Sequence, residues 1–466
     1  MSGSVSLKCV LLGGCCALMT LMVSSQAIAQ DASDFETTDL KSLQQQINDL
    51  KAKVEELQQE KSAADNIVMS AEQLAAIEPA AGDQETTKID WDLSPVFTSD
   101  DDRFSFQING RIAYDYANIN FKDGKGASIP GTKVNGIDNR YLETGFRGKM
   151  FGDINYRVAV KFVDNEVELK LAYINYAIGN TNFILGQVRT YTSLDKLTPP
   201  PNHSFSERFA FINALSIKPR IGVAVAQHGD NWSLSAGYFF ESTSSTDGSL
   251  DDNNMASGRL TFSPAFENGL GLHLGSSFFF RNENGNGYDK GYATRPLSKQ
   301  GAIKPLYSGD FNIASEKFIG AEFVATYKSF GFQAEYAQVT NDLNATEIQT
   351  TVNPKYEGGY VEFGFFPTGA ERTIRGTDGR YKNVKIDNPV GEGGYGEVRL
   401  AVRYDMADFT HETFGTKQKS LILSADWYLN DYLKIQANFA KSTIKDYQDI
   451  NTNEVDTFNL RFLMSF

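Results

Sequence analysis

Apolar and polar residues alternate along the chain from residue 103 to its end. In FSFQINGRIAYDY (residues 104–116), aromatic and aliphatic side chains take one parity and polar side chains the other. A period of two is typical of a β-strand with one apolar and one polar face. The pattern recurs in runs of about 8 to 14 residues that end in Gly, Asn or Asp. It predicts sixteen strands, over residues 103–121, 140–151, 153–164, 167–179, 181–190, 220–228, 231–241, 255–264, 270–282, 317–328, 329–341, 358–368, 395–409, 417–430, 431–445 and 455–466.

The alternation fits two kinds of all-β protein. A soluble sandwich turns its apolar faces inward, whereas a transmembrane barrel turns them toward lipid. The barrel is favoured because the strands are long enough to cross a tilted bilayer and their polar faces carry charges of both signs, as a water-filled lumen does. Short connections also alternate with long, Gly-rich ones, and we expect residues 281–317 and 368–394 on the side opposite the short turns. The predicted fold is a sixteen-stranded antiparallel transmembrane β-barrel over residues 103–466, wide enough to leave an aqueous channel.

The N-terminus has the pattern of a signal peptide. Lys8 precedes an apolar run, residues 9–23, and Ala27-Ile28-Ala29 follows as a small-x-small cleavage site. The alternative is a membrane anchor, but the run is shorter than the ~20 residues that a spanning helix needs. A lipoprotein acylated at Cys15 or Cys16 is a weaker alternative, because the apolar run continues past both. Residues 1–29 are therefore predicted to be removed by export.

A heptad repeat follows in residues 30–62. Its apolar residues are spaced alternately three and four apart, which is the seam of a short α-helical coiled coil. A helix of this length is marginal alone, so the repeat favours a homo-oligomer; the alternative is an amphipathic helix lying on the chain's own domain. Residues 63–102 lack such a pattern and are predicted as a linker. The seam consists of Leu40, Leu43, Ile47, Leu50, Val54 and Leu57.

Composition excludes several classes of protein. The only cysteines are Cys9, Cys15 and Cys16, so the exported chain would hold neither a disulfide scaffold nor a thiolate zinc site. With four histidines in all, a His-rich catalytic metal centre is disfavoured, and no metal or cofactor is expected. No group of Ser, His and Asn suggests a barrel lipase, and His273 takes the lumen parity. We expect neither an enzyme nor, given the acidic balance, a nucleic-acid-binding protein.

The net charge of −14 is unevenly distributed. Residues 30–89 hold 13 acids and 5 bases, whereas residues 103–466 hold 40 acids and 38 bases. The polar parity of the strands carries 12 bases and 8 acids. Rings of Arg and Lys are how a pore passes anions, but lumen charges of both signs can also simply pair and keep the pore wet. The bases are Arg111, Arg147, Lys149, Arg157, Lys161, Arg189, Arg259, Arg281, Arg399, Arg403, Lys434 and Arg461.

Several segments together resemble a known family. GDINYRVAVKF (152–162), VELKLAYINY (167–176), GQVRTYTSLDKLT (186–198), SERF (206–209) and GGYVEFGFFPTGAER follow FSFQINGRIAYDY in the order seen in the phosphate-selective porin O/P family. GGYGEVRLAVRYD and ADWYLNDYLKIQANFAKS continue the series to the C-terminal strand. The resemblance covers residues 92–466. It implies a trimeric sixteen-stranded channel, often with an N-terminal coiled coil, that takes up anions and above all phosphate.

The resemblance also suggests an anion pathway. Arg111 matches the basic residue of the first-strand G-R motif, and Arg140 matches one of a pair of arginines whose other position is Tyr141 here. Gln187 replaces a base of the most phosphate-selective members, and Arg189 is close enough in sequence to substitute for it. These departures favour a general anion preference over strict phosphate selectivity. The candidate pathway comprises Arg111, Arg140, Arg147, Arg157, Lys161, Arg189, Lys196, Arg208, Arg220, Arg259, Arg372, Arg380, Lys385, Arg399 and Arg403.

The sequence thus predicts a porin in the outer membrane of a Gram-negative bacterium, with the coiled coil in the periplasm. Its expected partners are small anions, phosphate or polyphosphate among them, outer-membrane lipid and two further copies of the chain. The alternatives are a general or cation-preferring diffusion porin, and a structural tether that uses the coiled coil.

Overall fold

The computed structural model describes residues 51–53, 55, 87–163, 166–240, 253–282, 288–344, 352–448 and 452–466. The predicted signal peptide and all six seam residues of the predicted coiled coil lie outside these ranges. The chain divides into two units, residues 1–84 and 85–466. Among the described helices, none has the length and apolar character to cross a membrane. The second unit contains all of the described strands.

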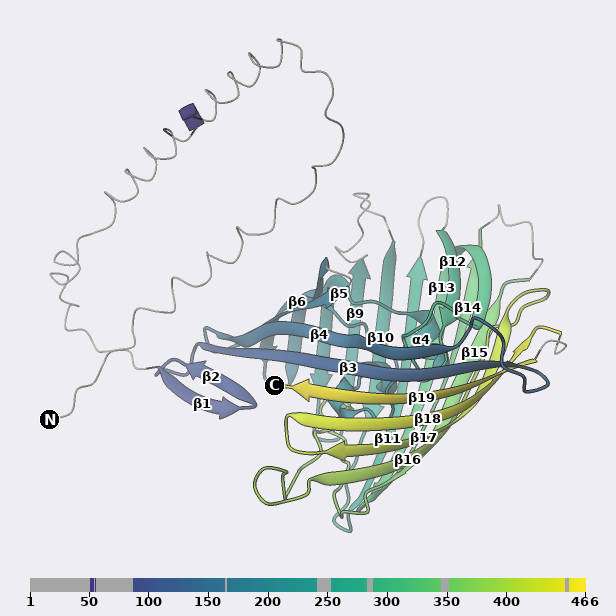
Figure 1. Cartoon of the computed structure of the whole chain (residues 1–466). Helices are drawn as coiled ribbons and strands as arrows, with labels where there is room; N and C mark the ends of the chain where they lie inside the picture. Colours follow the sequence, from purple (N-terminus) through teal and green to yellow (C-terminus); the bar gives the residue numbers. More distant parts are fainter. Residues whose placement is uncertain are drawn as a thin grey trace, which may run out of the picture. The chain divides into compact units, whose positions relative to one another are not determined.

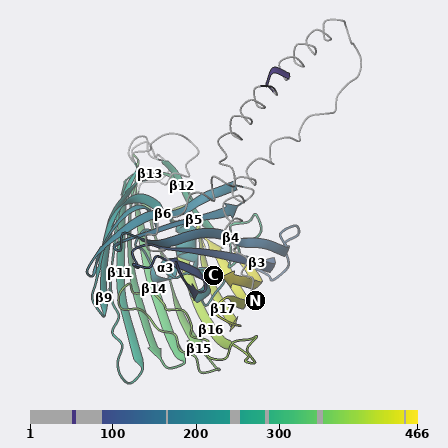
Figure 2. The ribbon, with the colours of Figure 1, turned by 90° about the vertical axis from the view of Figure 1, so that its left-hand side faces the viewer.

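Within the described residues, sixteen antiparallel strands form a closed barrel. Each strand pairs with the next along the wall, and the last strand pairs with the first from Asn453 opposite Asp123 to Ser465 opposite Arg111. Figures 1 and 2 show this continuous wall. All sixteen predicted strands are confirmed. They are β3 (Ser105–Asp123), β4 (Val134–Met150), β5 (Ile154–Val163), β6 (Glu166–Ile178), β7 (Thr181–Val188), β8 (Arg220–His228), β9 (Trp232–Phe240), β10 (Asn254–Phe262), β11 (Leu270–Asn282), β13 (Leu306–Tyr327), β14 (Phe330–Leu343), β15 (Lys355–Phe365), β16 (Glu397–Asp408), β17 (Thr416–Tyr428), β18 (Leu433–Asp446) and β19 (Thr452–Ser465).

The barrel is inverted relative to a soluble protein. In β17, Gln418 and Asp426 are buried on the lumen side, whereas Leu421 and Leu423 are each 51% exposed on the outside. Exposed aromatic and aliphatic side chains recur on the outer parity of the other strands. Because an apolar outer face is stable only in contact with lipid, this pattern agrees with a transmembrane barrel.

Two hairpins lie where the sequence predicted connections. β12 (Tyr288–Thr294) pairs with the first part of β13, which begins at Leu306 rather than at 317. Leu306, Phe311 and Ile313 are buried there, so the predicted loop 281–317 is in part an extension of the sheet. In the predicted linker, β1 (Lys88–Asp92) and β2 (Ser94–Thr98) form a second hairpin.

Two long connections fold into the barrel from opposite ends. Residues 189–219, between β7 and β8, contain α3 (Leu194–Leu197), η1 (Pro200–Asn202) and α4 (Ala210–Leu215). Residues 366–396, between β15 and β16, lie at the end of the short turns, where Phe366 N donates to Ser329 O (3.0 Å) and Val390 N donates to Leu429 O (2.7 Å). The predicted placement of 368–394 on the long-loop side is therefore wrong. Strand direction decides the side of a connection, and its length does not. We call these connections the loop-side insert (189–219) and the turn-side insert (366–396).

Candidate functional site in the barrel lumen

Polar groups of the barrel wall fix the loop-side insert in the lumen. Glu335 accepts hydrogen bonds from Ser193 Oγ (2.7 Å) and from Asp195 N (2.8 Å), at the first turn of α3. Asp405 accepts from Ala210 N (2.9 Å), which is the first residue of α4. Carboxylates at these positions satisfy backbone donors that short helices leave unpaired. The insert is therefore pinned at both of its helices.

Buried ion pairs fasten the same insert. Arg403 of the wall contacts Asp195 of the insert at 3.2 Å. Arg140 binds Glu207 through two hydrogen bonds, Nε to Oε1 (2.8 Å) and Nη2 to Oε2 (3.2 Å), and Arg461 lies 3.5 Å from the same carboxylate. Each of these five side chains is at most 8% exposed. Charges buried this deeply are held by their partners, so Arg140 and Arg403 act as anchors.

Three more arginines of the predicted pathway have carboxylate partners. Arg259 forms a bidentate pair with Glu322 (2.7 and 3.0 Å) and also donates to two carbonyls of the turn-side insert. Arg399 lies 3.1 Å from Glu362. Arg372 contacts Glu362 at 3.4 Å and donates to Asn202 O at 2.6 Å, which joins the turn-side insert to the loop-side insert. These guanidinium groups connect wall and inserts.

The inserts leave two adjoining chambers. The turn-side chamber, about 610 Å³, is lined in part by the C-terminal residue Phe466 and the β17–β18 turn. The loop-side chamber is about 520 Å³. Glu143, Lys170 and Arg189 line both, and we call this position the junction. Bases outnumber acids two to one in each lining.

The turn-side chamber is lined by the bases Arg111, Arg147, Arg157, Lys170, Arg189 and Lys434 and by the acids Asp92, Glu143 and Asp431. The loop-side chamber is lined by the bases Arg140, Lys161, Lys170, Arg189, Lys196, Arg208, Lys218 and Lys299 and by the acids Asp115, Asp138, Glu143 and Glu168.

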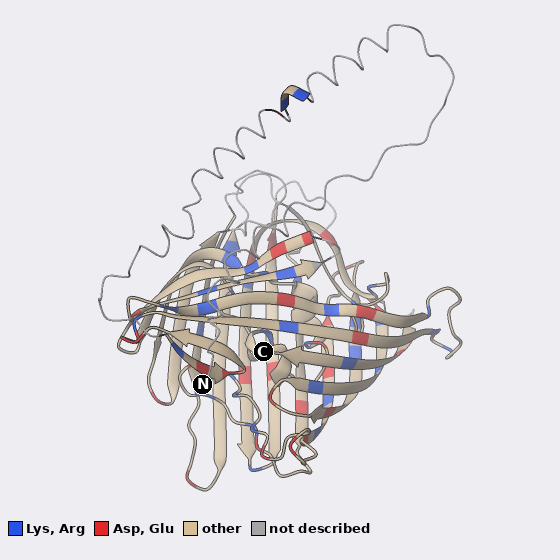
Figure 3. Cartoon of the chain, turned by 60° about the vertical axis from the view of Figure 1, so that its left-hand side comes forward, with Lys and Arg blue, Asp and Glu red and all other residues tan. Residues whose placement is uncertain are grey.

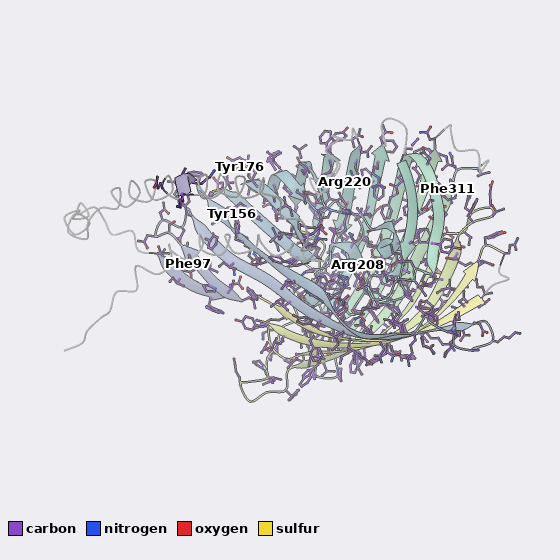
Figure 4. The ribbon with its side chains drawn as sticks, turned by 45° about the horizontal axis from the view of Figure 1, so that its top comes forward. Phe97, Tyr156, Tyr176, Arg208, Arg220 and Phe311 are labelled. Carbon is purple, nitrogen blue, oxygen red and sulfur yellow. The ribbon has the colours of Figure 1, made fainter. Side chains whose placement is uncertain are left out.

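Four bases at and beside the junction have no ion pair with any carboxylate that the structure describes: Arg157, Arg189, Lys196 and Arg208, here called the junction bases. Arg208 Nε instead donates to Asp195 O (3.2 Å), and Arg189 donates to Leu197 O (3.4 Å). Figure 4 places Arg208 in the middle of the barrel. Burial, with Arg208 and Arg189 close by, lowers the pKa of Lys196 well below that of a free lysine. At a site where burial and neighbouring cations disfavour a positive charge, a bound anion stabilises the charged form of the lysine.

Four other bases, Arg111, Lys170, Lys161 and Arg380, each have a carboxylate partner. Glu143 accepts from Arg111 (3.2 Å) and from Lys170. Lys161 lies 2.6 Å from Glu168, and Arg380 lies 2.7 Å from Asp378. Figure 3 shows acidic and basic residues interspersed over the strands.

The remaining candidates lie apart from the junction. Arg147 borders the turn-side chamber, 3.5 Å from Asp92. Arg220 is buried at the start of β8. Lys385 is exposed and lies 2.5 Å from Asp387.

Sequence reasoning missed two bases of the chambers. Lys170 lies on β6, where pairing with β5 shifts register after Ala159 and the outward parity changes from Val167 to Ile174. The change of apolar parity within VELKLAYINY was the available signal. Lys299 belongs to a connection without a period, so its position inside the barrel has no signal in the sequence.

The structure also brings together a serine, a histidine and a glutamate that the sequence did not suggest. Ser263 Oγ lies 2.8 Å from His273 Nδ1, and His273 Nε2 lies 3.0 Å from Glu322 Oε2. All three side chains are buried, and none of them lines either chamber. Without access for a substrate, this hydrogen-bonded chain stabilises the wall. Among the described residues, no cluster of His, Cys, Asp and Glu is suited to hold a metal ion.

Comparison with known proteins agrees with this architecture. The model of the family described as phosphate-selective porin O and P matches residues 106–466. The chain belongs to this family. Members of the phosphate-selective porin O and P family are channels rather than enzymes, so the chain is an outer-membrane porin.

Relatives of the chain include Porin O of Pseudomonas aeruginosa, 25% identical over 386 residues, which cover 73% of this chain and 84% of that protein. An uncharacterized protein of Caulobacter vibrioides is 28% identical over 472 residues, covering 95% of this chain and 91% of that one. Similar solved structures include an anion-selective porin from Comamonas acidovorans (TM-score 0.49, 12% identity, 78% of this chain and 100% of that one). Another is the outer membrane channel DcaP of Acinetobacter baumannii (TM-score 0.48, 14% identity, 79% and 99%).

Proposed function

We propose that this porin passes small anions by diffusion, with phosphate or polyphosphate among them. The observation that supports the proposal is the set of junction bases, Arg157, Arg189, Lys196 and Arg208, where the two chambers adjoin. Their positive charges have no ion pair within the described residues, whereas the anchoring arginines do. An anion that reaches the junction therefore meets cations that are free to bind it.

The arrangement favours passage over tight binding. Arg157 borders the turn-side chamber, Arg189 borders both chambers, and Lys196 and Arg208 border the loop-side chamber. An anion can thus pass from one base to the next without a step far from positive charge. Guanidinium groups match the geometry of phosphate oxygens, while the nearby carboxylate of Glu143 limits the attraction. Several weak sites in series allow both entry and release.

The decisive experiment is electrical. The purified porin is inserted into a planar bilayer between two concentrations of KCl, and the zero-current potential is measured. We expect a potential of anion sign, and we expect inorganic phosphate, titrated into chloride, to reduce the current. A potential of cation sign would reject the proposal, and a potential near zero would indicate a general diffusion porin.

We also propose that the porin is a homotrimer and that residues 30–62 form a periplasmic coiled coil between its subunits. Support comes from the heptad seam in the sequence. The test is the mass of the detergent-purified full-length protein, compared with a variant in which Ile47 and Leu50 are both changed to Asp. A trimer in the first and a smaller species in the second are expected. A monomeric full-length protein would contradict the proposal.

The bilayer recording also tests the alternative of a structural tether, which negligible conductance of the purified porin would favour.

A further inference from the structure

The β1–β2 hairpin is a compact element outside the barrel wall. Its two strands pair over their whole length, from Lys88 opposite Thr98 to Asp92 opposite Ser94. Leu93 alone makes the turn and has a positive φ of 60°. A non-glycine residue in this conformation is uncommon, and its surroundings must hold it there.

The hairpin is joined to the edge of the wall. β19 ends opposite Arg111, and the backbones of Phe466 and Gly110 hydrogen-bond to each other (2.8 and 3.1 Å). The first residues of β3 therefore extend beyond the end of β19, and β2 pairs with them instead, with Val96 opposite Gln107. Figure 1 shows β1 and β2 beside the start of β3 and the C-terminus. The hairpin thus continues the sheet at the turn-side mouth of the barrel.

Hydrogen bonds between the hairpin and the wall hold the tip of the hairpin at the rim of the barrel. Gln107 Nε2 donates to Asp92 O (2.5 Å), and Ser94 Oγ donates to Ile108 O (2.5 Å). Trp91 Nε1 donates to Tyr432 Oη (2.7 Å) of the β17–β18 turn. The tip is thereby tied to two parts of the rim that are far apart in sequence.

The tip borders the channel. Trp91, Asp92 and Leu93 line the turn-side chamber together with Arg147 and Arg157, and Asp92 Oδ2 lies 3.5 Å from Arg147 Nη2. The side chains of Asp92 and Arg147 are 70% and 46% exposed, so the pair is in contact with water and available to ions. A carboxylate at this point reduces the attraction of the mouth for anions.

We propose that the β1–β2 hairpin is a lip of the channel: its tip stands in the path of permeating ions, and Asp92 sets the charge of the turn-side mouth beside Arg147. This proposal rests only on the part of the proposed function that says the barrel conducts ions, and it does not depend on whether the barrel prefers anions or cations. The effect of Asp92 on selectivity is an effect of local charge and is measured as a difference from the wild type.

A single cysteine at the tip tests the position of the lip. The natural cysteines all lie within residues 1–16, so Leu93→Cys would provide the one thiol of the exported chain. During recording, an anionic methanethiosulfonate reagent is added to each side of the bilayer in turn. We expect a partial loss of the open-channel current when the reagent reaches the tip, because the added group narrows the path and its charge changes the local potential. Ile89→Cys, on the same hairpin and 64% exposed outside the chamber linings, is the matched control and should keep its current.

A second pair of variants tests the charge without altering the turn. Asp92→Asn should shift the zero-current potential toward anion preference, whereas Asp90→Asn, on the same strand but outside the chamber lining, should not. The proposed position of the tip would be overturned if mass spectrometry shows that Leu93→Cys protein is fully modified and the modified protein still conducts as before. Equal potentials for Asp92→Asn and the wild type would overturn the role of Asp92. Neither result depends on the sign of the wild-type potential, so each can be distinguished from failure of the anion proposal.

Discussion

The lumen bases have two different roles, and what separates them is the distance to a carboxylate. Arg403 lies within 3.2 Å of both Asp195 and Glu362, and it is 1% exposed. Arg208 and Lys196 lie on the same insert as Asp195 but contact no carboxylate among the described residues. Removing one member of a buried pair leaves an uncompensated charge, whereas removing a base that has no carboxylate partner leaves no carboxylate uncompensated. Substitutions should therefore separate folding from conduction.

The junction should respond to pH through Lys196. Because the pKa of Lys196 is lowered, its positive charge is present at low pH and is lost as the pH rises through a range where a free lysine would still be protonated. We expect the anion preference, measured as the zero-current potential, to fall as the pH is raised through the range below the pKa of a free lysine. Lys196→Arg should remove most of this dependence, because arginine stays charged. A wild-type potential that is constant over this range would contradict the prediction.

At the scale of elements, the inserts depend on the wall and on each other. Arg372 of the turn-side insert lies 3.4 Å from the ring of Tyr381, and it donates to Asn202 and Ser204 of the loop-side insert. Tyr381 Oη in turn donates to Gln333 of the wall (2.6 Å). The two inserts therefore contact each other, and the turn-side insert also contacts the wall.

The anchoring of the loop-side insert can be tested through Arg403. Arg403→Met should destabilise the protein by about 3 kcal/mol, because Asp195 and Glu362 would lose a buried partner. Urea unfolding in detergent measures the loss, and more frequent current fluctuations should accompany it as α3 is released. The matched control is Arg375→Met, because the side chains of Arg375 and its partner Asp378 are 41% and 26% exposed. Equal stability of the two variants would show that Arg403 is not an anchor.

The turn-side insert can be tested by proteolysis. Tyr381→Ala removes a buried side chain, its hydrogen bond to Gln333 and its contact with Arg372. Because local opening exposes backbone to proteases, trypsin should cut residues 366–396 several-fold faster than in the wild type. Tyr395→Ala, at a side chain 63% exposed, should not change the rate. Cleavage at the wild-type rate in both variants would contradict the role assigned to Tyr381.

At the scale of the whole molecule, the barrel could be predicted from the sequence because alternation is a local property of each strand. Every one of the sixteen strands was found in this way, and an even number lets the first and last strands pair antiparallel. The interior could not be predicted to the same extent. The Arg403–Asp195 pair joins residues 208 apart in sequence, and nothing local relates them. The length of residues 366–396 likewise does not indicate that they enter from the turn side, and the bulge in β6 moved Lys170 to an unexpected face.

The most direct test of the junction bases is the zero-current potential under a KCl gradient. It is measured for a variant that carries both Lys196→Glu and Arg208→Glu, for the wild type, and for Lys328→Glu as the control. The control lies on an external turn and changes the charge without reaching the chambers. We expect wild type and control to share an anion preference and the double variant to lose or reverse it. An unchanged potential in a double variant that still folds and conducts would contradict the claim that unpaired bases at the junction select the permeating ion.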